Sequence, residues 1–227
     1  MTVPAIAVDL GVERRARQTL GSSSNAIYQM VTRAMDAHGG AGTLVDVGCG
    51  GGQLWRALGR RCSRYLGLDA VRYDSFPADG EFHRVDLDRP TWPRIDGIAD
   101  VVTAVETIEH LNDPWTFVRR LASIVRPGGL VIITTPNQLS ALSLVTLLVK
   151  NRFSAFQDAQ FPAHRTALLE SDLLRIVREA GLESIQLAYS LHGRLPLTRW
   201  HYPEAIARLF PRALSDNVMV IARKPSA

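Results

Sequence analysis

Two glutamates and two histidines have the residue types and spacing to hold a metal ion or move a proton. Glu106, Glu109 and His110 fall within the segment ETIEHL, and His164 follows further along the chain. In a helix, positions i, i+3 and i+4 project from one side. Such a group suits Zn²⁺, Mn²⁺ or Fe²⁺, and Mg²⁺ less well. Alternatively, His110 or His164 serves as a general base. A third interpretation is that the glutamates meet a ligand's ammonium group or a helix start while His110 packs locally.

These side chains need a scaffold, and the segment LVDVGCGGGQL indicates one. Residues 43–47 are apolar and β-branched, as in a strand covered on both faces. Gly48, Gly50, Gly51 and Gly52 follow, and a helix is expected from Gln53. Glycines let a ligand approach the backbone, and a helix start offers free N–H groups. The pattern predicts a binding loop, although a turn that packs a helix on a strand without a ligand is an alternative.

The spacing of the glycines separates two kinds of binding loop. A dinucleotide fingerprint would place its third glycine at position 53, where this chain has glutamine. The chain instead has the pattern Asp46-x-Gly48-x-Gly50-x-Gly52. A second predicted strand, 64–68, ends on Asp69, about 20 residues past the glycines, where an acid accepts hydrogen bonds from ribose hydroxyls. A third, 82–85, ends on Asp86, which could equally be a turn or cap residue.

Predicted strands and helices alternate along the chain. Further strands are expected at 100–105, 130–135, 182–189 and 217–222, and helices at 25–38, 114–125 and 171–180. Strands separated by helices predict an α/β fold with a mostly parallel seven-stranded sheet and helices on both faces.

The run DVVTAVETIEHLNDPWTFVRRLASIVRPGGLVIITTPN, with the glycine pattern and the closing VMVIARKP, carries a family resemblance over residues 24–224. It resembles the class I S-adenosylmethionine-dependent methyltransferases, in particular the group that includes the ubiquinone-biosynthesis O-methyltransferases. The resemblance implies a Rossmann-like fold whose last strand is antiparallel. It also implies S-adenosyl-L-methionine as cofactor, with Gly48 and Gly50 near its methionine part, Asp69 at the ribose, Asp86 and Leu87 at the adenine, and Val105 near the sulfonium.

Three further residues belong to the expected cofactor site. Asp46 and Cys49 come with the glycine loop, and Tyr28 comes from the helix expected over the cleft. Ordinary packing is the alternative for Tyr28.

The Glu-x-x-Glu-His pattern with a distant histidine resembles the metal site of small-RNA 2′-O-methyltransferases. We therefore expect a methyltransferase, with a divalent metal at Glu106, Glu109, His110 and His164 as one hypothesis. The expected reaction is O-methylation of a small phenolic, quinone-like or natural-product acceptor in secondary metabolism. The alternatives are an RNA 2′-O-methyltransferase with a divalent metal and a non-catalytic module that binds S-adenosylmethionine.

Length and composition predict one domain over residues 1–227. Residues 1–40 are expected to form a helical cap, and 138–165 and 191–213 are expected to form substrate lids. The apolar and aromatic content of the lids predicts an apolar or aromatic acceptor. Core packing or a homodimer contact would explain the same content.

Charge and hydropathy restrict the kinds of partner that this protein is expected to bind. The formal net charge is +4, and because basic residues occur along the whole length, nucleic acid is not the expected partner. The apolar run 139–149 is shorter than the roughly 20 residues that cross a bilayer, so stable membrane insertion is not expected. Two cysteines without metal or disulfide spacing fit a reducing cytoplasm.

Overall fold

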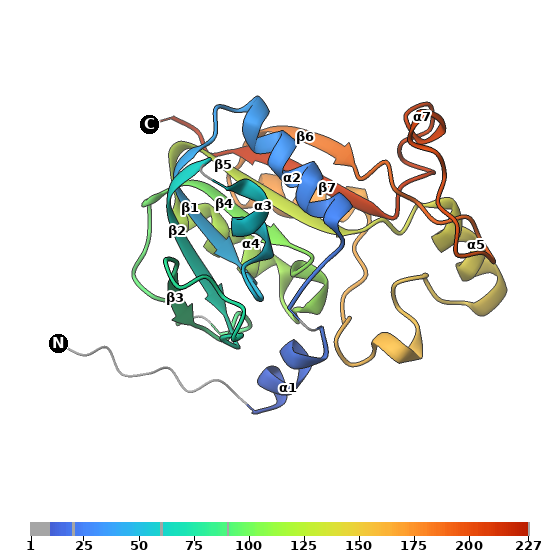
Figure 1. Ribbon diagram of the computed structural model, residues 1–227, viewed down its shortest axis with the longest axis horizontal. Coiled ribbons are helices and arrows are strands. Elements are labelled where there is room, and N and C mark those ends of the chain that lie inside the picture. Colours follow the sequence, from blue (N-terminus) through green and yellow to red (C-terminus); the bar gives the residue numbers. More distant parts are fainter. Residues whose placement is uncertain (1–9, 20, 60, 90, 227) are drawn as a thin grey trace.

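The structure is a computed structural model, which describes residues 10–19, 21–59, 61–89 and 91–226. Its centre is a seven-stranded sheet in the order β3-β2-β1-β4-β5-β7-β6 (Figure 1). The strands are β1 (Ala41–Val47), β2 (Cys62–Asp69), β3 (Glu81–Arg84), β4 (Ala99–Val105), β5 (Val125–Pro136), β6 (Glu183–Tyr189) and β7 (Asn217–Arg223).

Strand direction confirms the expected Rossmann-like sheet. The pairs β1–β2, β1–β4, β2–β3 and β4–β5 are parallel. β7 lies between β5 and β6 and is antiparallel to both. Because β1, β2 and β4 are parallel neighbours, their carboxyl ends lie together at one end of the strands. Ligands of open α/β sheets bind there.

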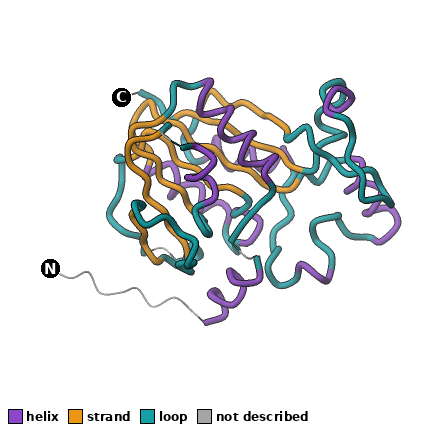
Figure 2. Tube along the Cα trace, viewed as in Figure 1, coloured by secondary structure: helices purple, strands orange, loops and turns teal. Residues whose placement is uncertain are grey.

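Helices cover both faces of the sheet (Figure 2). α2 (Asn25–Ala37) and α3 (Gln53–Leu58) pack on one face, and α4 (Pro114–Ile124) and α6 (Glu170–Glu179) pack on the other. Each pair contributes to a separate hydrophobic cluster, with Met35 and Leu58 fully buried on the first face and Phe117 and Ile176 on the second. Each such side chain contributes roughly 1.5–3 kcal/mol when fully buried.

Local signals explain where α4 begins. The Asp113 side chain accepts a hydrogen bond from Thr116 N at 3.0 Å, and Pro114 occupies the first turn, where its missing N–H costs nothing. The next strand begins earlier than expected. β5 starts at Val125, which pairs with Ala99 before an irregularity in register, whereas the sequence predicted a turn at 126–129 and a strand from residue 130.

Among the described residues, three helices lie outside the layered body. They are α1 (Leu10–Gln18), α5 (Ala141–Lys150) and α7 (Glu204–Ala207), and there are also two short 3₁₀ helices, η1 (Ile108–His110) and η2 (Asp158–Gln160). The first nine residues of the predicted N-terminal cap lie outside the described residues. No helix in the described part of the chain is long and apolar enough to cross a membrane.

The two edges of the sheet are short or irregular. β3 has only four residues. On the opposite edge, the register between β6 and β7 shifts between Glu183 and Gln186, and Ser184 adopts a positive φ of 50°. Neither edge therefore presents a long, regular row of free backbone groups.

Candidate active site

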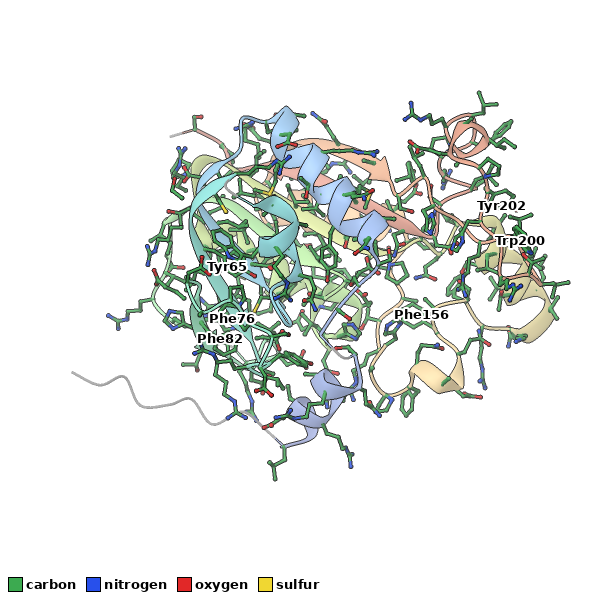
Figure 3. All side chains as sticks on the ribbon, in the orientation of Figure 1. Tyr65, Phe76, Phe82, Phe156, Trp200 and Tyr202 are labelled. Carbon is green, nitrogen blue, oxygen red and sulfur yellow. The ribbon has the colours of Figure 1, made fainter. Side chains whose placement is uncertain are left out.

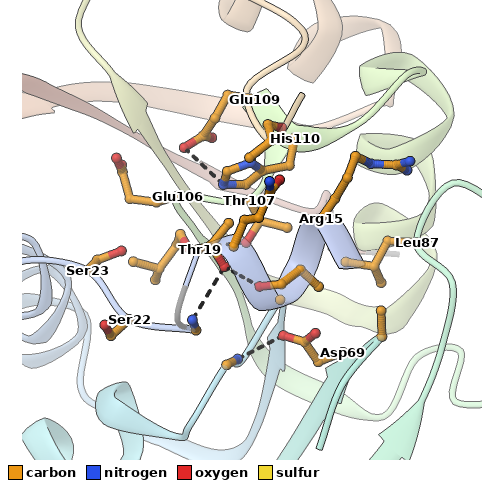
Figure 4. Close-up of a pocket in the computed structure, with 18 of the residues that line it drawn as sticks. Arg15, Thr19, Ser22, Ser23, Asp69, Leu87, Glu106, Thr107, Glu109 and His110 are labelled. Carbon is orange, nitrogen blue, oxygen red and sulfur yellow. Dashed lines mark hydrogen bonds and ion pairs between the residues drawn. The ribbon is translucent and has the colours of Figure 1, made fainter. Parts of the chain in front are cut away.

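A cavity of about 610 Å³ opens at the carboxyl ends of β1, β2 and β4. Figure 4 shows part of its lining. All of the residues predicted to bind the cofactor or a metal, or to act in catalysis, line it, namely Tyr28, Asp46, Gly48, Cys49, Gly50, Asp69, Asp86, Leu87, Val105, Glu106, Glu109, His110 and His164. The structure thus brings together residues from β1, β2 and β4 and from the segment after β3.

The glycine loop between β1 and α3 is closely packed. Gly48 and Gly50 have positive φ values of 76° and 51°. A Cβ atom on Gly48 would lie 2.2 Å from Thr107 Oγ1, and one on Gly50 would lie 2.1 Å from the carbonyl oxygen of Gly21. Both positions require glycine because of the backbone conformation and because neighbouring segments approach the loop.

Asp69 ties the tip of β2 to the loop. Its carboxylate accepts hydrogen bonds from Gly50 N at 2.9 Å and Val71 N at 3.1 Å. Burial raises the pKa of this carboxyl group, and the bonds from Gly50 and Val71 oppose that shift. An ionised carboxylate offers about four acceptor positions, so lone pairs are left to face the cavity.

Asp86 combines the two roles considered from sequence. It lines the cavity, and its side chain also accepts a hydrogen bond from Asp88 N at 3.1 Å, which forms a local turn. Its other oxygen lies 3.6 Å from Arg89 Nε.

Asp46 is braced inside the sheet. It accepts hydrogen bonds from Tyr65 on β2 and Thr103 on β4, both at 2.8 Å. Burial raises its pKa to about 6, and the two hydroxyl donors oppose the shift. Asp46 therefore joins three strands directly beneath the glycine loop.

Glu109, His110 and His164 form a compact triplet. One atom from each side chain falls within 4.8 Å of the others, and Glu109 Oε1 lies 3.9 Å from His110 Nε2. Glu109 is buried; its Oε2 accepts a hydrogen bond from Thr135 at 3.2 Å, while Oε1 has no hydrogen-bond partner among the described residues. The triplet thus contains an unpaired, buried acceptor oxygen.

Backbone carbonyls fix both imidazole rings. His110 Nδ1 lies 2.9 Å from Ala163 O, and His164 Nδ1 lies 2.6 Å from Ala155 O. Since a carbonyl oxygen only accepts, each Nδ1 carries the hydrogen and each Nε2 keeps its lone pair. The ring centroids are 4.8 Å apart. Burial lowers the pKa of His110, and it lowers that of His164 to about 4, so both rings are neutral near pH 7.

The prediction that Glu106, Glu109 and His110 project from one side of a helix is wrong. The chain forms only the three-residue η1 after β4, and Glu106 has a positive φ of 49°. Its two carboxylate oxygens accept hydrogen bonds from Thr134 at 2.9 Å and Asn217 at 2.8 Å. Glu106 therefore borders the cavity but lies outside the triplet, because a left-handed residue turns its side chain toward β5 and β7.

The sequence predicted a helical cap over residues 1–40 but did not indicate which residues before position 22 line the cavity. Arg15 and Thr19 line the cavity, and Arg15 lies 3.6 Å from Asp88. Thr107 was also missed, although it contacts the glycine loop and donates to Val47 O at 3.3 Å. The segment before residue 22 has only weak periodicity, so no sequence pattern pointed to Arg15.

The two predicted lid segments have different positions. Residues 159, 160, 163 and 164 from the first segment line the main cavity. The second segment, 191–213, contributes no residue to that lining. Leu191, His192, Tyr202 and Glu204 instead border a second cavity of about 400 Å³ between α2 and β6–β7.

Comparisons with known proteins agree with this geometry. The family model described as "Methyltransferase domain" matches residues 17–187. The ubiquinone biosynthesis O-methyltransferase of Leptothrix cholodnii is 28% identical over 193 residues, covering 81% of this chain and 78% of that protein. Its counterpart in Cupriavidus pinatubonensis is 26% identical over 162 residues, covering 63% of this chain and 61% of that protein.

A solved structure shows the same fold. The N-methyltransferase NodS of Bradyrhizobium japonicum, in complex with S-adenosyl-L-homocysteine, superposes with a TM-score of 0.59 at 12% identity, covering 96% of this chain and all of that one.

The sheet order and the glycine loop define a Rossmann-like domain with its ligand cavity at the carboxyl edge of the sheet. The chain belongs to the methyltransferase domain family and is a class I S-adenosylmethionine-dependent methyltransferase.

Proposed function

We propose that this methyltransferase transfers the methyl group to an oxygen of a small phenolic or quinone-like acceptor in secondary metabolism. Two named ubiquinone biosynthesis O-methyltransferases among its relatives support this acceptor class. The observation that carries the proposal is the triplet of Glu109, His110 and His164, which lies in the same cavity as the cofactor-binding motif.

The proposed cofactor position follows the lining of the cavity. Gly48 and Gly50 face the methionine part, Asp69 accepts from the ribose, and Asp86 with Leu87 holds the adenine. Tyr28, Asp46, Cys49 and Val105 complete the site. Bound S-adenosylmethionine supplies a methyl group that is already activated on a sulfonium, so the protein mainly has to orient the acceptor.

The triplet fits a divalent metal ion. Glu109 Oε1 is a buried oxygen with no hydrogen-bond partner in the described part of the chain, and both Nε2 atoms have free lone pairs. Histidines that bind metals usually donate their other ring N–H to a carbonyl or carboxylate, as His110 and His164 do. Imidazole and carboxylate ligands favour Zn²⁺, Mn²⁺ or Fe²⁺ over Mg²⁺.

The chain's own groups then have distinct tasks. A bound ion would lower the pKa of an acceptor hydroxyl as a Lewis acid. Glu109 and the two imidazoles hold and orient the reacting end of the acceptor next to Val105. Without an ion, the Nε2 lone pair of His110 or His164 is the alternative proton acceptor.

The experiment combines metal analysis with transfer to catechol as the probe acceptor. We expect purified protein to contain divalent metal by elemental analysis, and a chelator to abolish methyl transfer until Zn²⁺ or Mn²⁺ is restored. Glu109→Gln should lose both the metal and at least about 90% of activity, since single groups of this kind contribute roughly 10²–10⁴-fold.

Glu106→Gln is the matched control, because Glu106 borders the same cavity but lies outside the triplet. It should retain the metal. Full activity in chelator with no bound metal would exclude the metal, and transfer to no phenol, with retained cofactor binding, would contradict the acceptor class.

A further inference from the structure

The helix α5 buries a polar side chain and exposes apolar ones. Its one buried side chain is Ser143, whereas Leu148 and Val149 are 86% and 75% exposed. Helices of water-soluble proteins normally turn their apolar stripe toward the core. The helix carries no charge before Lys150, its last residue. Its exposed apolar side therefore has no apolar partner in the described part of the chain.

The segment 191–213 joins α5 to form one apolar lobe, which we define as residues 141–152 and 191–213. Ala141 N donates to Ala213 O at 2.7 Å, and Asn137 Nδ2 donates to Arg212 O at 2.7 Å. Figure 3 shows Trp200 at the same end of the molecule as α5. Large exposed side chains of this segment are Leu197 at 99%, Trp200 at 69%, Leu209 at 72% and Phe210 at 62%.

The apolar lobe also carries the positive charge of the molecule. It contains six basic residues and one acidic residue, which leaves 20 basic and 21 acidic residues elsewhere in the chain. The formal net charge of +4 therefore originates in the lobe. Lys150 and Arg199 form no ion pair within the described residues. The other four form ion pairs, namely Arg152 with Asp158, Arg194 with Asp216, Arg208 with Glu204 and Arg212 with Glu170.

We propose that the apolar lobe binds reversibly to the surface of an anionic lipid bilayer. Exposed Leu, Phe and Trp side chains enter the boundary between headgroups and acyl chains, while Lys and Arg remain at the anionic headgroups. The ten-residue α5 is far too short to span the bilayer, so it would lie in the plane. This inference concerns an outer surface and does not rest on the proposed acceptor.

Two other occupants fit the observations less well. A second copy of the chain would bring two net-positive lobes together, and like charges across an interface oppose association. Nucleic acid would be held through phosphates and stacked bases, which leaves the exposed Leu148 and Val149 without a role.

The test is co-sedimentation of the full chain with vesicles of phosphatidylcholine, with and without phosphatidylglycerol. We expect binding to the anionic vesicles that weakens in high salt. The double variant Leu148→Glu with Trp200→Glu should lower the partition coefficient at least about tenfold, because two apolar anchors become charged. Lys150→Glu with Arg199→Glu, which leaves the apolar side chains intact, should lower it by a similar factor.

Leu10→Glu is the control, since Leu10 is an exposed leucine on α1, outside the lobe. It should leave vesicle binding unchanged. The proposal is overturned if the protein ignores anionic vesicles or if the lobe variants bind as well as the parent. It is equally overturned if analytical ultracentrifugation shows a dimer that the lobe variants dissociate, or if the lobe binds single-stranded RNA in place of vesicles.

Discussion

At the scale of single residues, Asp46 is a carboxyl group whose ionised form is disfavoured because it is buried in the sheet beneath the glycine loop. Burial raises the pKa of Asp46 to about 6, against an ordinary value of 3.8. The folded state therefore binds the proton more tightly than the unfolded state between these two pH values. The stability that this group contributes is fully present below pH 3.8 and is lost as pH rises through about 6.

We predict that Asp46→Asn removes this loss. Relative to the variant, the parent's free energy of unfolding should fall by on the order of 2–3 kcal/mol between pH 4 and pH 7. Urea unfolding at several pH values measures the difference. Asp96→Asn, at an exposed site, is the control substitution of the same chemistry. A flat difference for Asp46→Asn would contradict the buried charge.

The lining residues at the ends of β1, β2 and β4 were largely predictable from sequence, because glycine spacing and strand ends mark where parallel strands present a ligand site. Their individual contacts were not. Glu106 departs from the helical pattern because it adopts a left-handed backbone and binds Asn217, which lies 111 residues away. Arg15 comes from a helix with weak periodicity. Local sequence does not indicate the contact of Glu106 with Asn217 or that of Arg15 with Asp88, because both join distant parts of the chain.

At the scale of elements, α1 is a cover held only at its surface. None of its side chains is buried, and it is fastened by Arg15 to Asp88 and by Tyr73 Oη, which donates to Ala16 O at 2.7 Å. Its residues nevertheless line the cavity. We therefore expect α1 to contribute little to folding and more to the retention of a ligand.

We predict that deleting residues 1–18 speeds release of S-adenosylhomocysteine at least about tenfold while the melting temperature changes by only about 2–4 °C. Stopped-flow displacement and calorimetry measure the two quantities. Arg17→Ala is the matched control, because Arg17 pairs with Glu13 on the same helix and does not line the cavity. An unchanged release rate would show that α1 does not retain the ligand.

Most elements of the sheet follow from local sequence. The β-branched runs predicted the seven strands, and Asp113-Pro114 marked the start of α4. The start of β5 was displaced because Val125 pairs with Ala99 on β4. That pairing depends on a neighbouring strand rather than on the Arg-Pro-Gly-Gly sequence that suggested a turn.

At the scale of the whole molecule, we propose a single folded domain in which residues 191–213 form a loosely attached appendage. The two hydrophobic clusters share one sheet, whereas within 191–213 only Gly193 and Ala207 are buried. Segments with few buried contacts open at low free energy.

We predict that trypsin first cuts after Arg199, which is exposed and has no ion pair in the described part of the chain. Mass spectrometry of early fragments identifies the site. In Arg199→Gln, the first cut should move to Arg194 or Arg208 in the same segment. First cleavage within 41–136 would contradict the proposed organisation.

The irregular sheet edges affect how copies of this protein meet in concentrated solution. An open sheet has two edge strands to which another chain could add a strand and begin a fibril. Here β3 offers four residues, and the kink at Ser184 interrupts β6. Neither edge strand therefore offers a long, regular template for backbone pairing, so contacts between copies are left mainly to side chains.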